Sequence, residues 1–342
     1  MLLARRCPIL AVFCFTATLL AQPSDAPLKH GDATRVARRA ASRINEGYVF
    51  PDVGQAMEKD ILARIARNEY DGIVSAQALC NKLTQDLQSV SHDNHIRVVF
   101  NLPPPSGGQR QGMGGPRANL GVQKVEKLAG NIGYLDFRAF LPVDAAGEAV
   151  TNAMNALADT DALIIDVRQN GGGAPAMVAF LASYLFDSKP VQLNTMYSRG
   201  APKPSELWTR AEVPGRRYGP DKPVYVLIGR GSFSAAEGFT YHLQALRRIT
   251  VVGEQSGGGA NPGGVVAIDD HFGVFVPGSR VVNPITKTNW EGVGVRPDIE
   301  SSPEKALQVA HLAALRRLMD ATSDPARKKR FQDAVAELAG LR

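Results

Sequence analysis

The sequence predicts an α/β protein in which a small helical bundle precedes a core of alternating strands and helices, with further helices at the C-terminus. Apolar residues recur at helical spacing between Ala33 and about Val90, and short β-rich segments alternate with helical ones from Gly121 onward. From Pro303 to the C-terminus the apolar residues again form a helical stripe. Strands that alternate with crossover helices form largely parallel sheets, so we expect the core sheet to be substantially parallel.

The N-terminal helical bundle is predicted over residues 22–90. Three helices suit it, because Gly47, Pro51 and Gly72 interrupt the periodic pattern. The apolar positions that carry the pattern are Ile44, Tyr48, Met57, Ile61, Ile65, Ile73, Leu79, Leu83 and Leu87.

The core is predicted over residues 91–302 and begins with a strand at Ile96–Phe100. A Pro- and Gly-rich stretch, Pro103–Pro116, cannot bury a core and predicts a mobile surface loop over residues 103–118. The other predicted strands are Ile132–Phe137, Ala162–Val167, Val224–Ile228, Thr250–Val252, Gly264–Ile268 and Val274–Val276, and the predicted helices are Ala145–Ala158, Ala174–Phe186 and Ala235–Leu246. Residues 303–342 are predicted to form one or two C-terminal amphipathic helices.

Residues 1–21 have the pattern of a cleavable signal peptide. A basic start that ends at Arg6 precedes the apolar run Pro8–Leu20, and Ala21 is a small residue suited to cleavage. The apolar run is shorter than the roughly 20 residues that span a bilayer, so we expect a secreted or periplasmic protein without stable membrane insertion. After cleavage only Cys80 remains, and its helical surroundings predict a small core residue and no internal disulfide.

The charge of the chain gives no sign of a nucleic-acid partner. The formal net charge is +6, which falls to +4 once Arg5 and Arg6 leave with the signal peptide. The basic clusters at residues 35–39 and 327–330 suit solvated helix faces, and neither zinc-finger spacing nor aromatic–basic interleaving accompanies them. The sequence leaves the oligomeric state open, a homo-oligomer included.

Ser234 is the candidate nucleophile. It lies in Gly231-Ser-Phe-Ser-Ala-Ala-Glu237, after the apolar strand Val224–Ile228 and before a helical segment. A serine at such a turn exposes its hydroxyl, and the first amides of a helix lack internal partners, so they can face an oxyanion. The alternative is an ordinary N-cap serine.

A glycine-rich run, Asp166-Val-Arg-Gln-Asn-Gly-Gly-Gly173, joins another predicted strand to a helix. Glycines there let the backbone approach a ligand, and their amides can bind an anion. Neither the phosphate-loop nor the dinucleotide spacing of glycines is met. An oxyanion hole and a simple tight turn remain.

Two histidines and one glutamate complete the chemically interesting residues. Ser91-His-Asp-Asn-His95 lacks an HExxH helix and a nearby third ligand, so we expect no metal site. One imidazole suffices to activate a serine, and His92 is interpreted as a surface residue. Glu291 lies in the turn-rich run Asn289–Asp298, for which an ordinary surface turn is the alternative.

The order of these motifs resembles the tail-specific (C-terminal processing) serine peptidases. The resemblance covers about Tyr48 to Ile299, includes the strand Gly130–Leu135, and is strongest to the branch of the tricorn core protease and the interphotoreceptor retinoid-binding protein modules. It implies a ββα-spiral core of the crotonase and Clp-peptidase type. It also implies a serine endopeptidase without metal or organic cofactor, acting on peptides or unfolded proteins.

The resemblance assigns roles to individual residues. Ser234 matches the family nucleophile, His95 the general base, and Glu291 a glutamate of the catalytic tetrad. The amides of Gly172 and Ala235 would form the oxyanion hole.

The chain also departs from the family. The bacterial processing proteases have a dyad lysine where this chain has Gly259, and they carry a PDZ module for which this chain has only the Pro/Gly-rich stretch. Tricorn has a serine before its histidine where this chain has Asn94, so a relay from Glu291 to His95 would use that amide, a water or direct contact. A module that binds apolar ligands in the manner of the retinoid-binding branch, or an esterase, remains an alternative.

Overall fold

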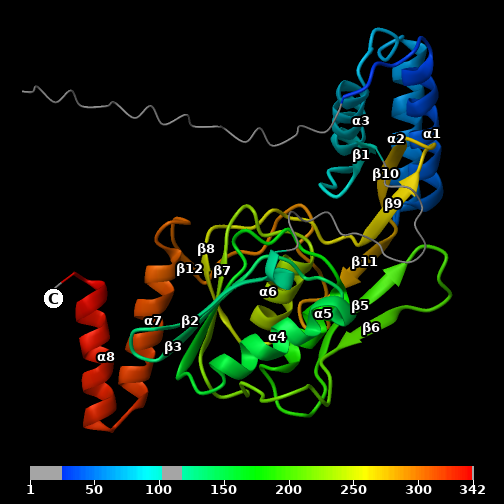
Figure 1. The fold of residues 1–342 in the computed structure, drawn as a ribbon. Coiled ribbons are helices and arrows are strands. Elements are labelled where there is room, and N and C mark those ends of the chain that lie inside the picture. The colour runs from blue at the N-terminus through cyan, green and yellow to red at the C-terminus, as the bar shows by residue number, and fades with distance from the viewer. Residues whose placement is uncertain (1–24, 102–117, 341–342) are drawn as a thin grey trace, which may run out of the picture.

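A computed structural model describes residues 25–101 and 118–340 of the chain. Within these ranges it confirms the predicted mixed α/β fold, with a six-stranded sheet and two smaller three-stranded sheets (Figure 1). The predicted signal peptide and the Pro103–Pro116 stretch lie outside the described residues. No helix in the described ranges has the length and apolarity to cross a membrane.

The N-terminal bundle consists of α1 (Asp32–Gly47), α2 (Pro51–Ala66) and α3 (Ala76–Ser91). Pro51 occupies the first turn of α2, and Ser75 caps α3 by accepting a hydrogen bond from the amide of Ala78 at 3.0 Å. Cys80 is 2% exposed in the bundle core, as predicted for a small core residue, and burial raises the pKa of its thiol to about 12.

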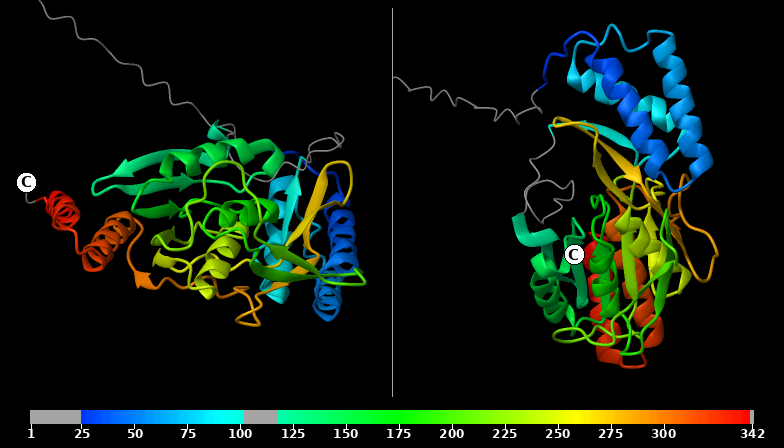
Figure 2. Two further views of the ribbon diagram at one scale, coloured as in Figure 1. Left: turned by 90° about the horizontal axis from the view of Figure 1, so that it is seen from below. Right: turned by 90° about the vertical axis from the view of Figure 1, so that its right-hand side faces the viewer.

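The bundle shares its core with an antiparallel sheet of β1 (Arg97–Phe100), β10 (Phe272–Pro277) and β9 (Gly263–Ala267), in the order β1-β10-β9. Figure 2 shows the hairpin of β9 and β10 lying against the first helices, far from it in sequence. This pairing brings the turn between α3 and β1 next to the loop that precedes β9.

The main sheet has the order β12-β8-β7-β4-β3-β2. Its strands pair in parallel except β2 with β3. The strands are β2 (Val122–Leu128), β3 (Ile132–Phe137), β4 (Ala162–Asp166), β7 (Val224–Ile228), β8 (Thr250–Gly253) and β12 (Ile299–Glu300). A short 3₁₀ helix, Ala118–Gly121, leads into β2.

Helices cover both faces of the main sheet (Figure 1). One face carries α4 (Val143–Leu157), α5 (Pro175–Ser183) and α6 (Ala235–Ala245), and the other carries α7 (Ala306–Ala321) and α8 (Pro325–Leu338). A third sheet, in the order β11-β5-β6, comprises β5 (Gln192–Ser198), β6 (Ser205–Trp208) and β11 (Ser279–Val282). The loops that follow the adjacent parallel strands β4 and β7 leave the same edge of the sheet, where ligand sites of α/β proteins form.

Candidate active site

Ser234 is the N-cap residue of α6 and has a strained backbone. Its φ of 55° and ψ of −117° are rare for a residue other than glycine and cost about 1–3 kcal/mol. Its amide donates a hydrogen bond to the Glu237 carboxylate at 2.8 Å, and this contact stabilises the turn. Ser232, by contrast, is fully buried and its hydroxyl donates to the carbonyl of Val167 at 2.7 Å. Of these two serines only Ser234 is partly exposed.

Gly172 packs against the turn at Ser234, as the predicted oxyanion hole requires. A Cβ on Gly172 would lie 2.8 Å from Cβ of Ser234 and 2.9 Å from the amide nitrogen of Ala235. Any residue other than glycine at this position would therefore push the turn at Ser234 away. The Ala235 amide begins α6 and has no hydrogen-bond acceptor within residues 25–101 and 118–340. The Ala235 amide is therefore available to donate a hydrogen bond to an anion.

The Gly172 amide differs from the expectation, because it is already engaged. It donates to Oδ1 of Asn170 at 2.9 Å. Asn170 is fully buried, donates to the carbonyl of Phe137 at 2.9 Å, and accepts at its own carbonyl from the amide of Phe233 at 3.0 Å. Gly172 thus lies beside the turn at Ser234, but its amide already has the side-chain oxygen of Asn170 as acceptor.

His95 lies in the turn between α3 and β1 and is 5% exposed. Its ring packs on Phe233, the neighbour of Ser234, with 4.6 Å between ring centroids, and stacks on Phe275 of β10 at 5.7 Å. The fold therefore brings the predicted base against the turn that carries Ser234. His92 caps α3 and is exposed, as expected for a surface residue.

Asp93 also lies beside His95, although it was not among the residues predicted for the site. It is 1% exposed, and its Oδ1 lies 3.7 Å from Nδ1 of His95. The hydroxyl of Tyr48 donates to its Oδ2 at 3.2 Å, and the side-chain amide of Asn261 donates there at 3.0 Å. Its place two residues before His95 was the only signal in the sequence.

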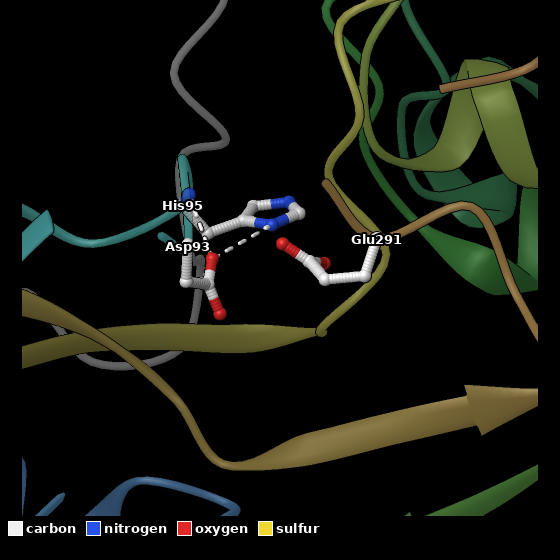
Figure 3. A group of neighbouring side chains, drawn as sticks. All are labelled: Asp93, His95 and Glu291. Atoms are coloured by element: carbon white, nitrogen blue, oxygen red, sulfur yellow. Dashed lines mark hydrogen bonds and ion pairs between the residues drawn. The ribbon is translucent and has the colours of Figure 1, made fainter. Parts of the chain in front are cut away.

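Glu291 reaches the same imidazole from the C-terminal part of the core (Figure 3). Its Oε2 accepts from the amides of Ala260 at 2.5 Å and Asn261 at 3.0 Å. Its Oε1 is buried and has no hydrogen-bond partner within the described ranges. One ligand atom each of Asp93, His95 and Glu291 lies within 4.8 Å of the others, so the imidazole is flanked by two carboxylates.

The side chain of Asn94, the possible relay residue, bonds to the backbone of Gly257. Asn94 is exposed, and its side-chain amide donates to the carbonyl of Gly257 at 3.4 Å. The groups that flank the imidazole are the carboxylates of Asp93 and Glu291.

Burial is the largest cause of the pKa shifts of His95, Glu291 and Asp93. It lowers the pKa of His95 to about 4, with a further contribution from the charge of Arg97. Burial, and then the charge of Asp93, raises the pKa of Glu291 to about 8, and burial raises the pKa of Asp93 as well. At neutral pH the imidazole is therefore uncharged, the form in which it can accept a proton.

Gly259, which is predicted to stand where the processing proteases have their dyad lysine, leaves no room for a side chain. A Cβ there would lie 2.7 Å from Cε1 of His95 and 2.2 Å from Cζ of Phe233. The histidine and phenylalanine rings fill the space that a lysine side chain would need. Lys287, the next lysine in the chain after this position, is exposed.

Glu237 joins the serine turn to the loop that carries Gly259. This carboxylate is fully buried and accepts from the hydroxyl of Ser256 at 2.6 Å and from the amides of Gly258 at 2.6 Å and Gly259 at 2.9 Å. Glu237 also accepts from the Ser234 amide. These contacts therefore hold the loop around Gly259, which packs against His95, at a fixed position relative to Ser234.

Comparison with known proteins identifies the family. The model of Peptidase family S41 matches residues 131–301, half of the chain, and that of the N-terminal domain of Peptidase S41 in eukaryotic IRBP matches residues 29–118. The chain is 29% identical over 142 residues to the C-terminal processing peptidase, chloroplastic, of Tetradesmus obliquus. The matched segment covers 42% of this chain and 29% of the relative. It is 25% identical over 186 residues to the carboxy-terminal-processing protease of Bartonella bacilliformis, covering 52% of this chain and 41% of the relative.

Solved structures support the fold. A candidate peptidase from Parabacteroides merdae superimposes with a TM-score of 0.57 at 20% identity, covering 81% of this chain and 91% of that chain. The tricorn protease superimposes with a TM-score of 0.53 at 13% identity, covering 90% of this chain and 37% of that chain. The chain spans less than half the length of the two curated relatives. The order of motifs, the fold and the matched family model agree, and the chain belongs to peptidase family S41.

Proposed function

We propose that this protein is a serine peptidase that uses Ser234 as nucleophile, His95 as general base and Glu291 as the group that orients and stabilises the base. One observation carries the proposal: residues far apart in sequence meet around Gly259, where the ring of His95 lies between Phe233 and the two carboxylates. A module that only binds ligands has no need for a neutral, buried imidazole beside a strained serine turn.

In the proposed mechanism, His95 takes the hydroxyl proton of Ser234 as its oxygen attacks the substrate carbonyl, and later gives that proton to the leaving amine. Glu291 in its ionised form stabilises the protonated imidazole, which burial alone would disfavour. The Ala235 amide supports the oxyanion, a contribution of about 3 kcal/mol for each such donor. The Gly172 amide joins it once it exchanges its Asn170 acceptor for the oxyanion.

Peptides or unfolded proteins are the proposed substrates, outside the cytoplasm. The family match supports peptide chemistry, and the pattern of residues 1–21 supports export to the periplasm or medium. The two curated relatives process C-termini. Only residues 102–117 separate the described parts on either side, too few for a PDZ module, so we do not extend recognition of free C-termini to this chain.

Labelling with a fluorophosphonate probe tests the proposal, because the probe reacts with activated serines. Wild type should be labelled and should cleave casein, and Ser234→Ala should lose both while keeping its circular dichroism spectrum. Ser232→Ala serves as the control, since that hydroxyl is buried and bonded. Labelling that persists in Ser234→Ala would overturn the assignment. Cleavage of esters without peptides would favour an esterase, and an unlabelled wild type that binds retinoids would favour the binding module.

A further inference from the structure

The cluster around His95 holds an unusual number of unpaired buried atoms. Within the described residues, four buried side-chain atoms lack hydrogen-bond partners: Nδ1 and Nε2 of His95, Oε1 of Glu291 and Oδ1 of Asn261. All four belong to one place, because Asn261 is itself bonded to Asp93. Buried polar atoms are nearly always paired, so four unpaired atoms at one point leave this cluster free to bind a ligand.

The geometry suits a small cation with few protein ligands. Nδ1 of His95 lies 3.7 Å from Oδ1 of Asp93, and one atom each of these residues and of Glu291 lies within 4.8 Å of the other two. Figure 3 shows both carboxylates turned toward the imidazole. Tetrahedral zinc, with ligand bonds of about 2.0–2.2 Å, needs ligand atoms roughly 3.3 Å apart, and the 3.7 Å between Nδ1 of His95 and Oδ1 of Asp93 is near this spacing.

Charge and ligand type select the metal. Two carboxylates in a buried site repel each other, and a divalent cation removes that repulsion. One imidazole with two carboxylates, plus an open position, is a ligand set that zinc accepts, whereas magnesium and calcium prefer oxygen ligands alone.

The carboxylates are already held in place by a second layer of hydrogen bonds. Tyr48 and Asn261 donate to Asp93, and the backbone amides of residues 260 and 261 donate to Glu291. Such supporting contacts fix ligand orientation and raise metal affinity. The sequence offered no third ligand near the histidines, but the fold supplies it from Glu291, 196 positions after His95 (291 − 95).

We propose that Asp93, His95 and Glu291 form a binding site for Zn²⁺ and that its occupancy switches the enzyme off. The inhibitory part rests on the proposed function. A metal bound at Nδ1 leaves the ring proton on Nε2, so the imidazole can no longer accept the proton of Ser234. Removal of the metal restores the base without any covalent change.

The test is a titration of metal-free Ser234→Ala with Zn²⁺ by calorimetry and with Co²⁺ as a spectroscopic probe. This variant keeps all three ligands, so binding is measured independently of peptidase activity. We expect one ion per chain and the intense visible bands of tetrahedral Co²⁺. Adding His95→Ala, Asp93→Asn or Glu291→Gln to this background should each weaken binding by about tenfold or more. The control Asp270→Asn alters an exposed carboxylate and should leave binding unchanged.

The outcomes separate the two proposals. Absence of binding, or equal binding by the ligand variants and the control, would overturn the zinc site and leave the peptidase assignment standing. Zinc that binds at these ligands without inhibiting an active wild type would overturn the inhibitory switch and the role of His95 as base. Inhibition of wild type that EDTA reverses, with the same affinity as the calorimetric site, is the supporting result.

Discussion

Glu291→Gln should make the protein more stable and less active. The glutamine oxygen can replace Oε2 and keep the hydrogen bonds from the amides of Ala260 and Asn261. Its NH₂ group then takes the place of Oε1 and donates to Nδ1 of His95. That contact fixes the ring proton on Nε2, the wrong tautomer for a base that must accept a proton from Ser234.

The size of the stability gain follows from the pKa of Glu291, which rises from 4.5 to about 8 in the folded protein. A raised folded-state pKa contributes stability that is fully present below pH 4.5 and is lost as the pH rises through 8. At about 1.36 kcal/mol per pKa unit, the full loss is up to about 5 kcal/mol at alkaline pH. Glutamine cannot ionise, so the variant escapes this loss.

Urea unfolding at pH 4.5 and 8.5, with EDTA present to exclude metal, measures the effect. The free energy of unfolding of Glu291→Gln relative to wild type should increase by several kcal/mol between the two pH values, in order of magnitude. The exposed Glu300 provides the matched control, Glu300→Gln, which should show no such increase. If the difference in the free energy of unfolding between Glu291→Gln and wild type did not change with pH, the prediction would be refuted. Ionisation of Glu291 would then not destabilise the folded protein.

Activity should fall by about 10³–10⁴ in the same variant, less than in His95→Ala. Near-normal kcat/KM in Glu291→Gln would show that this carboxylate does not orient the base.

Three further predictions concern the same site. His95→Ala should lower kcat by several orders of magnitude. In wild type with EDTA present, kcat/KM should rise near pH 8, where Glu291 ionises, and not near 6.5, because burial raises the pKa of Glu291 to about 8 and lowers that of His95 to about 4. A limb near 6.5 that persists in Glu291→Gln, or full turnover in His95→Ala, would contradict a buried histidine base supported by Glu291. Gly259→Ala should cost about 1–3 kcal/mol of stability and most of the activity, since its Cβ meets two rings, whereas Gly264→Ala has open space and serves as the control in thermal melts and assays. Glu237→Gln should reduce kcat with little change in KM, because the carboxylate positions the serine turn without touching substrate, and the exposed Glu206→Gln is its control; a rise in KM at constant kcat would count against this role.

Segments with strong local patterns could be predicted from the sequence. The predicted strands Ile132–Phe137 and Val224–Ile228 match β3 and β7 residue for residue, because both are mainly apolar runs whose residues are all buried. β2, β5, β6, β11 and β12 were not predicted. β2, for example, reads Val-Gln-Lys-Val-Glu-Lys-Leu and lies at the sheet edge with much of its surface exposed, so its strand character depends on pairing with β3.

The turn at Ser234 could be predicted from residues 224–246 alone, because a buried strand, a short loop and a helix start are local features. The sequence also singled out His95 and Glu291, but only through the order of motifs. The tertiary structure alone decided that Asp93 flanks the imidazole, that the Gly172 amide is engaged by Asn170, and that Gly259 leaves room for His95. The physical reason is the pairing of β1 with β10, which joins residues about 175 positions apart in sequence and carries the turn at His95 against the loop before β9. Contacts of such long range depend on packing of whole elements, which no local spacing encodes.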